Sequence, residues 1–197
     1  MTAPLYAQPS ANVPTVEVGQ VDFEYEDLQL YEDDLLQVEV EFEFGNNPNP
    51  SAPSPEWIDK VLVTLTIAFV LDEETAQRAG TRIRAYQTTA RLVSVEANED
   101  TTIYFYLPHE IVQRDRISGE PFAYLVEFEV DGDPIPRPGG RAYDNSSGRT
   151  TVEAFKSAVN PELSKTEGFL LTQQQLDPSR VIAIHRPAPT FFFPSEP

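Results

Sequence analysis

Carboxylates are the most abundant groups in this sequence that could take part in chemistry. The 197 residues include 32 Asp and Glu, 14 Lys and Arg and two His, which gives a formal charge of −18. Residues 1–60 hold 13 of the acids, and Lys60 is the only base among them. Glu39, Glu41 and Glu43 alternate with apolar residues, so a β-strand would carry all three on one face. The pattern predicts a negatively charged surface for a basic protein partner; the alternative is a solvated strand face that prevents edge aggregation.

The acids could also form two kinds of site, and their spacing in the sequence does not decide whether either site is present. A pair of carboxylates can hydrolyse a glycosidic bond if folding brings the two groups together, so a carboxylate-based hydrolase is one alternative function. Acids between Glu24 and Asp34 could gather oxygen ligands for Ca²⁺, but they lack the spacing of a calcium-binding loop. Asp131-Gly132-Asp133 resembles the start of such a loop, and we interpret it as a hairpin turn.

The sequence lacks the residue patterns of other common catalytic sites. It contains no cysteine, which excludes disulfides, thiolate metal sites and cysteine nucleophiles. It also has no G-x-S-x-G elbow, no phosphate-binding or dinucleotide-binding glycine motif and no H-E-x-x-H. The negative charge would repel nucleic acid and anionic lipid, and the apolar runs are shorter than the ~20 residues of a spanning helix. We expect a non-catalytic protein with no cofactor or metal, no nucleic acid partner and no direct membrane insertion.

Aromatic residues suggest a second alternative function, carbohydrate binding. The chain has eight Tyr, twelve Phe and one Trp. Tyr104, Phe105 and Tyr106 are consecutive, so a strand cannot turn all three toward the core. Exposed Tyr and Trp side chains can stack on sugar rings. The alternative is that these aromatic residues pack in the core of the protein. The candidate residues for a sugar-binding surface are Trp57, Tyr104, Tyr106 and Tyr124.

The C-terminal tail, residues 188–197, combines prolines with three adjacent phenylalanines, Phe191, Phe192 and Phe193. Burial of each phenylalanine would contribute about 2 kcal/mol of free energy, so the tail should pack against protein. We expect it to dock on the parent domain or to insert into another subunit, with disorder as a third alternative.

Alternation with a period of two is the main signal for the fold. Residues 36–44 and 122–130 each alternate apolar and polar side chains, which predicts two amphipathic strands. Residues 61–70 are apolar or Thr throughout, which predicts a central strand covered on both faces. Weaker strands are predicted over 16–25, with a bulge at Gly19-Gln20, and over 82–95, 102–107 and 180–185.

Helical signals are sparse and short. Thr150 or Thr151 could cap a helix that carries Val152, Phe155 and Val159 on one face. Asn160-Pro161-Glu162 followed by Gly168 predicts a second short helix, and residues 72–80 predict a third.

Seven or eight short strands with Pro- and Gly-rich connections predict a mainly β protein that forms a single antiparallel β-sandwich. We assign the sandwich domain, with one to three short helices, to residues 15–187. Residues 1–14 are a predicted flexible N-terminal extension, and residues 188–197 form the tail described above. The pattern is similar to immunoglobulin-like or fimbrial-type sandwich domains of bacterial surfaces, although the cysteines that mark antibody domains are absent.

The absence of catalytic motifs, together with the terminal extensions and the apolar tail, predicts a structural or interaction protein. We expect a subunit or accessory of a bacterial cell-surface, pilus or secretion-type assembly that binds protein partners or a second copy of itself. The start of the chain is rich in Ala, Pro, Gln and Ser, which favours a periplasmic, cell-surface or secreted protein over a cytoplasmic one. The residues expected to contact the partner are Phe191, Phe192, Phe193, Glu39, Glu41 and Glu43.

Overall fold

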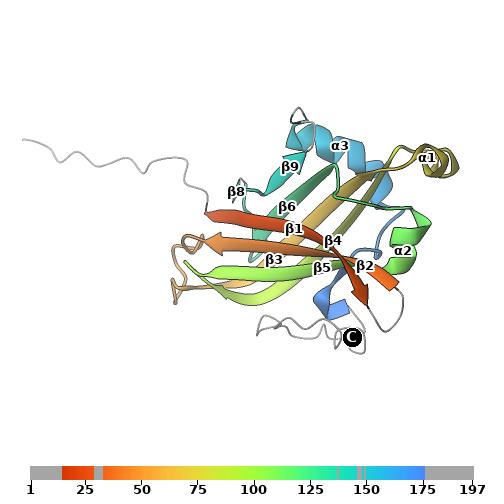
Figure 1. Cartoon of the computed structure of the whole chain (residues 1–197). Coiled ribbons are helices and arrows are strands. Elements are labelled where there is room, and N and C mark those ends of the chain that lie inside the picture. The colour runs from red at the N-terminus through yellow and green to blue at the C-terminus, as the bar shows by residue number, and fades with distance from the viewer. Residues whose placement is uncertain (1–14, 29–32, 137, 146–147, 149, 176–197) are drawn as a thin grey trace, which may run out of the picture.

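The structure is a computed structural model in which two β-sheets pack against each other (Figure 1). It describes residues 15–28, 33–136, 138–145, 148 and 150–175. The long strands are β1 Val16–Leu28, β2 Asp33–Phe44, β3 Trp57–Val70, β4 Ile83–Glu96, β5 Asp100–Leu107 and β6 Ala123–Val130. The short strands are β7 Asp133–Pro134, β8 Gly139–Gly140, β9 Tyr143–Asn145 and β10 Leu171–Thr172. The helices are α1 Glu73–Ala79, α2 His109–Arg114 and α3 Val152–Leu163, and the predicted β-sandwich with a few short helices is confirmed.

The first sheet, sheet A, has the strand order β10-β5-β2-β1-β8. β1 and β2 form an antiparallel hairpin, and β5 pairs antiparallel with the other edge of β2. The register of β1 against β2 shifts between Val18 and Val21, which confirms the predicted bulge at Gly19-Gln20. The shift keeps Val18 and Val21 on the buried face although they are three residues apart.

The second sheet, sheet B, has the order β4-β3-β6-β7, and β9 also pairs with β6. β3 lies between β4 and β6 as predicted for a central strand. Asp131 and Gly132 join β6 to β7 with φ angles of 51° and 93°. Two positive φ values in a two-residue connection are typical of a tight hairpin turn, so the hairpin interpretation of this segment is confirmed.

The core lies between the two sheets and follows the predicted alternation. Three aromatic rings join the sheets: the ring centroid of Phe128 on β6 lies 5.0 Å from that of Phe42 and 5.8 Å from that of Phe44, both on β2. Both contacts have the edge-to-face geometry that aromatic pairs prefer. All three side chains are buried.

Helix α3 covers part of the outer face of sheet B. Its N-cap, Thr151, accepts a hydrogen bond from the backbone N–H of Ala154, and Phe155 and Val159 pack on small residues of β3, β4 and β6. The predicted helix is therefore confirmed, but the prediction of a separate second helix is wrong, because Pro161 lies inside α3. Proline costs one backbone hydrogen bond near the end of the helix, and the buried face formed by Phe155, Val159 and Glu162 offsets it.

The other two helices lie at one end of the sandwich (Figure 1). Helix α1 matches the prediction for residues 72–80: Asp72 caps its first turn, and Gly80 ends it with a φ of 69°. Helix α2 was not predicted, because it follows Pro108 without a side-chain cap. Its position is set by tertiary packing, because Val112 is buried in the main core.

Three of the predicted segments lie outside the described residues. These are the N-terminal extension 1–14, the strand predicted over 180–185 and the tail 188–197 with its three phenylalanines.

Gly140 allows the loop after β7 to add strand β8 to the edge of sheet A. A Cβ on Gly140 would lie 2.1 Å from the backbone oxygen of Val18, and the φ of Gly140 is 63°. We predict that Gly140→Ala lowers the free energy of unfolding by at least about 1 kcal/mol, since the new atom must push β8 away from β1. Urea denaturation measures this loss. Gly45→Ala is the control, because a Cβ there meets nothing within 4 Å; equal losses in the two variants would contradict the prediction.

Candidate functional site

The outer face of sheet A, which is turned away from sheet B, carries acids on three neighbouring strands. Glu17 on β1 lies opposite Glu43 on β2, which in turn lies opposite Asp100 on β5. Like charges directly opposite one another destabilise a sheet, so this row costs folding free energy. We call the whole set the acidic face, and its members are Glu17, Asp22, Glu24, Glu39, Glu41, Glu43 and Asp100.

Predicted contact residues Glu39, Glu41 and Glu43 thus lie together, as the alternation of β2 requires. Asp22 on β1 lies opposite Glu39 and extends the set to a second row of acids. The carboxylate of Glu41 lies over the β1 bulge, where a Cβ on Gly19 would be 3.1 Å from Oε1 of Glu41. None of the ion pairs between described residues involves Glu41 or Glu43. The face is therefore a dense array of negative charge.

A small buried patch adjoins the acidic face on the same side of sheet A. Gln37 on β2 lies opposite Tyr106 on β5 and Glu24 on β1. Leu35 and Tyr106 are 6% and 1% exposed and form an apolar cluster that is separate from the sandwich interior. We call this the Gln37 patch, and its members are Leu35, Gln37, Tyr104, Tyr106 and Leu171.

Gln37 is the unusual residue of this patch, because it is only 1% exposed. Neither Nε2 nor Oε1 of its side chain has a hydrogen-bond partner among the residues that the structure describes. A buried amide without partners costs about 1–3 kcal/mol, and the patch presents an NH2 donor group and a carbonyl acceptor that no described residue satisfies.

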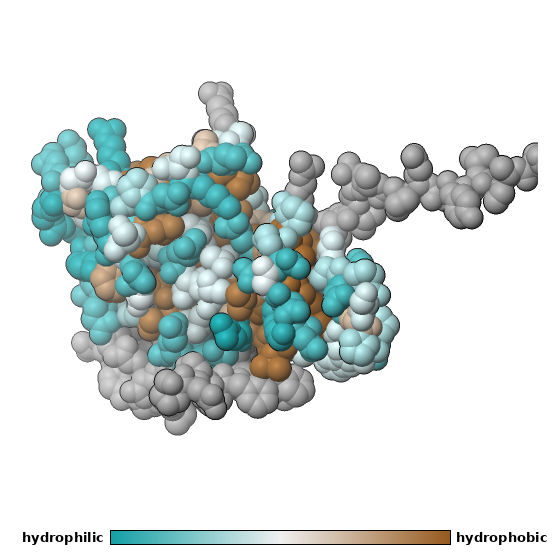
Figure 2. Space-filling view, turned by 180° about the vertical axis from the view of Figure 1, so that it is seen from behind, coloured by the Kyte–Doolittle hydropathy of each residue, from teal (hydrophilic) through white to brown (hydrophobic). Residues whose placement is uncertain are grey.

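The four candidate sugar-binding aromatics do not share a surface. Tyr124 on β6 points into the core, where it is 7% exposed and its ring centroid is 5.6 Å from that of Phe23. Trp57, at the start of β3 in sheet B, is 40% exposed. Tyr104 and Tyr106 belong to the outer face of sheet A, in the other layer of the sandwich. Figure 2 shows the side opposite to that of Figure 1, where apolar residues reach the surface in patches separated by hydrophilic ones.

Two buried acids take part in a network that ties α2 and α3 to sheet B. Asp115, just after α2, accepts hydrogen bonds from Nε of Arg114 at 2.9 Å, from Nη2 of Arg114 at 2.6 Å and from the hydroxyl of Tyr86. Arg84 on β4 lies between the two acids, with Nε 3.5 Å from Oδ2 of Asp115 and Nη1 3.3 Å from Oε2 of Glu162 on α3.

Hydrogen bonding determines the protonation of this network. Burial opposes ionisation of Asp115, but hydrogen bonds from Arg114 and Tyr86 outweigh it and hold the pKa of Asp115 below its usual value. Burial and the hydrogen bond to Asp115 raise the pKa of Tyr86, which stays neutral. Because each acid already contacts fixed cations, the arrangement positions helices and leaves neither acid unpaired for general acid catalysis.

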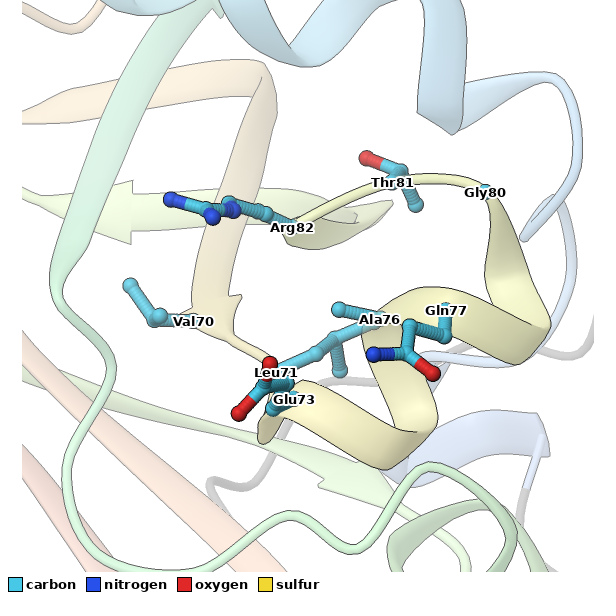
Figure 3. A pocket seen from close by; sticks show the side chains of 8 residues that line it. All are labelled: Val70, Leu71, Glu73, Ala76, Gln77, Gly80, Thr81 and Arg82. Carbon is cyan, nitrogen blue, oxygen red and sulfur yellow. The ribbon is translucent and has the colours of Figure 1, made fainter.

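A pocket of about 610 Å³ lies between α1 and the adjacent ends of β3 and β4 (Figure 3). Its lining has one acid, Glu73, and the side chain of Arg82 extends away from helix α1 in this view. Glycoside hydrolysis needs a second carboxylate within the same site, and the lining does not supply one. The pocket is lined by Val70, Leu71, Glu73, Ala76, Gln77, Gly80, Thr81 and Arg82.

Over the described ranges, no three side chains of His, Asp or Glu are grouped so that they could hold a metal ion. Within the same ranges, no helix is both long and apolar enough to cross a membrane. The remaining predicted contact residues, Phe191, Phe192 and Phe193, lie outside the described residues.

Sequence reasoning did not single out the Gln37 patch. A signal was present, because Leu35 and Leu36 are adjacent and a strand must turn one of them outward. The alternation also places Gln37 on the outer face, but its burial depends on neighbouring segments and not on β2 alone. The buried network was not predicted either, since Arg84, Asp115 and Glu162 are far apart in sequence.

Comparisons with known proteins identify the fold and no family. No family model matches the chain, and no curated protein does. A crystal structure of a protein from Akkermansia muciniphila is similar, with a TM-score of 0.57 and 19% sequence identity. The match covers 96% of this chain and 100% of that one. At this level of identity the similarity supports the sandwich fold alone.

Proposed function

We propose that this protein is a non-catalytic interaction domain that binds a basic, extended segment of a protein partner along the outer face of sheet A. One observation carries the proposal: this face joins rows of directly opposed acids to the buried amide of Gln37, which has no hydrogen-bond partner among the described residues. Both features cost folding free energy in the isolated domain, and a bound cationic chain would relieve both.

The chemistry of the face defines the partner. Lys or Arg side chains would pair with the acids around Glu41 and Glu43, while the backbone of the partner segment would satisfy the amide of Gln37. Leu35, Tyr104 and Tyr106 would supply apolar contact at one end. The segment we expect is therefore basic with apolar residues interspersed, and the same charge disfavours nucleic acid as a partner.

The biological setting that we propose is a subunit or accessory of a bacterial cell-surface, pilus or secretion-type assembly, in the periplasm, at the cell surface or secreted. Sandwich domains can act in such assemblies through exposed strand edges, faces and terminal extensions. The buried acids of the network and the pocket beside α1 give no support to the hydrolase alternative, and the scattered aromatics give none to carbohydrate binding.

A binding titration with a cationic peptide tests this proposal. We expect the full chain to bind a fluorescein-labelled peptide of alternating Lys and Val, with an affinity that falls as salt is added. Replacing Glu39, Glu41 and Glu43 together by Gln should weaken binding at least about tenfold, because each lost ion pair contributes some tenths of a kcal/mol or more. Fluorescence anisotropy measures both effects.

The matched control makes the same change of net charge on other surfaces. Glu73, Glu96 and Glu153 are exposed and lie on α1, at the end of β4 and on α3. Their joint replacement by Gln should change the affinity less than twofold to threefold, as expected for long-range screening alone. Equal weakening by both triple variants would show that binding responds to net charge and not to the acidic face.

A further inference from the structure

We infer that residues 180–186 of this chain dock on the Gln37 patch of the same molecule. The inference rests on the proposed function in one respect, since both use the outer face of sheet A. At the end of the face next to β5 it replaces the partner by a segment of the chain itself, and it leaves the acids around Glu41 and Glu43 to the partner.

The patch has the properties of a covered surface, although it is on the outward side of sheet A. Gln37 and Tyr106 are each 1% exposed and Leu35 is 6% exposed. The amide of Gln37 offers one acceptor and donor hydrogens that no described residue meets. An extended polypeptide carries a carbonyl oxygen and an N–H at each residue, so a chain that crosses Gln37 can satisfy both.

The sequence of residues 180–186 matches this surface. It reads Arg-Val-Ile-Ala-Ile-His-Arg, with four apolar residues in its centre and a positive charge at each end. The patch has Leu35, Tyr106 and Leu171 at its centre, and acids of β1 and β2, including Glu24 and Glu39, lie beside it. Burial of the apolar centre and pairing of the two arginines with those acids would favour the same placement.

The described chain ends next to the patch, so this segment is within reach of it. β10 pairs with the edge of β5, where Leu171 lies opposite Tyr106 of the patch. Gln173–Gln175 form a single helical turn after β10, in which Oε1 of Gln175 accepts a hydrogen bond of 2.9 Å from the backbone N–H of Thr172. The five residues from Gln175 to Arg180 can span up to about 17 Å, whereas crossing from β5 to β1 requires only about 10 Å.

Paramagnetic relaxation enhancement on the full chain tests the inference. The natural sequence has no cysteine, so Ala188→Cys provides a unique attachment point for a nitroxide just beyond the segment. We expect the largest loss of amide signal at the outward-facing residues of β1, β2 and β5 around Gln37. The protein is kept dilute, so that contacts between two molecules do not contribute. In the same background, Arg180→Glu with Arg186→Glu should abolish that localised loss.

The control double variant, Arg78→Glu with Arg82→Glu, makes the same charge change near α1, and should leave the localised signal loss intact. Weak loss spread over the whole domain, or a maximum on sheet B, would overturn the inference. A second experiment mixes spin-labelled chains without ¹⁵N and ¹⁵N-labelled chains without the nitroxide. Signal loss around Gln37 in this mixture would show that a second copy supplies the segment, which also overturns docking within one molecule.

Failure of this inference can be distinguished from failure of the proposed function. If the segment does not dock but the Lys–Val peptide still binds through Glu39, Glu41 and Glu43, the proposed function stands without this occupant. If the segment docks and the peptide does not bind, the face serves the chain itself and the proposed partner is excluded.

Discussion

Replacing Asp115 by Ala is expected to lower the free energy of unfolding by about 3–5 kcal/mol, because it leaves buried partners without their acceptor. The Tyr86 hydroxyl loses its hydrogen bond, and the guanidinium of Arg84 keeps only Glu162 as a counter-charge in this network. The anchor of α2 against β4 is lost at the same time. Equilibrium unfolding in urea, followed by tryptophan fluorescence and circular dichroism, measures the change.

Asp131→Asn is the matched control for this experiment, because Asn removes the charge and tolerates the φ of 51° at this position. Asp131 also accepts from a cation, Nζ of Lys60 at 2.5 Å, but both side chains are exposed. An exposed ion pair contributes about 0–1 kcal/mol, so the control should lose no more than that. A loss for Asp115→Ala as small as the control's would show that the network does not hold the helices.

The network also predicts how stability depends on pH. The pKa of Asp115 is lower in the folded chain than the value of about 3.9 for a free carboxyl. Its contribution is therefore complete above that free value and is lost as pH falls through the lower folded pKa. Asp115→Ala should remove this part of the acid dependence, so the difference in stability between wild type and variant should shrink below pH about 4.

Phe128→Ala is expected to have an effect of similar size, about 3–5 kcal/mol, because it opens a cavity between the sheets. The ring of Phe128 contacts Phe42 and Phe44 across the sandwich, and the side chain is 2% exposed. Thermal and urea unfolding measure the loss.

Val93→Ala supplies the comparison for this core variant. Val93 lies on β4 and is 42% exposed, so its truncation should change stability by no more than about 0.5 kcal/mol. If the two substitutions had equal effects, the three phenylalanines would not form the contact between the sheets.

The strands could be predicted from sequence because their signal is local. In residues 36–44 every second side chain is apolar, and one buried face is enough to fix β2 and its orientation. The bulge at Gly19-Gln20 was visible for the same reason, as a change of phase within one strand. Helices α1 and α3 carried capping residues, Asp72 and Thr151, next to their first turns.

Features that depend on distant contacts could not be predicted. Helix α2 has no capping side chain, and its contacts with the core and the Asp115 network keep it in place. Pro161 suggested a helix boundary, but packing of α3 on sheet B outweighed the local preference. For the candidate site, alternation placed Glu39, Glu41 and Glu43 on one face, whereas the row from Glu17 to Asp100 required the register of three strands.

Mapping of the cationic peptide by NMR tests the central claim most directly, namely that the outer face of sheet A is a binding surface. The ¹⁵N-labelled full chain is titrated with the Lys–Val peptide at low salt, and changes in amide chemical shift are assigned to residues. We predict that the largest changes fall on outward positions of β1, β2 and β5, centred on Glu41 and Glu39. Changes centred on the pocket beside α1 or on Trp57, or no changes at all, would contradict this account.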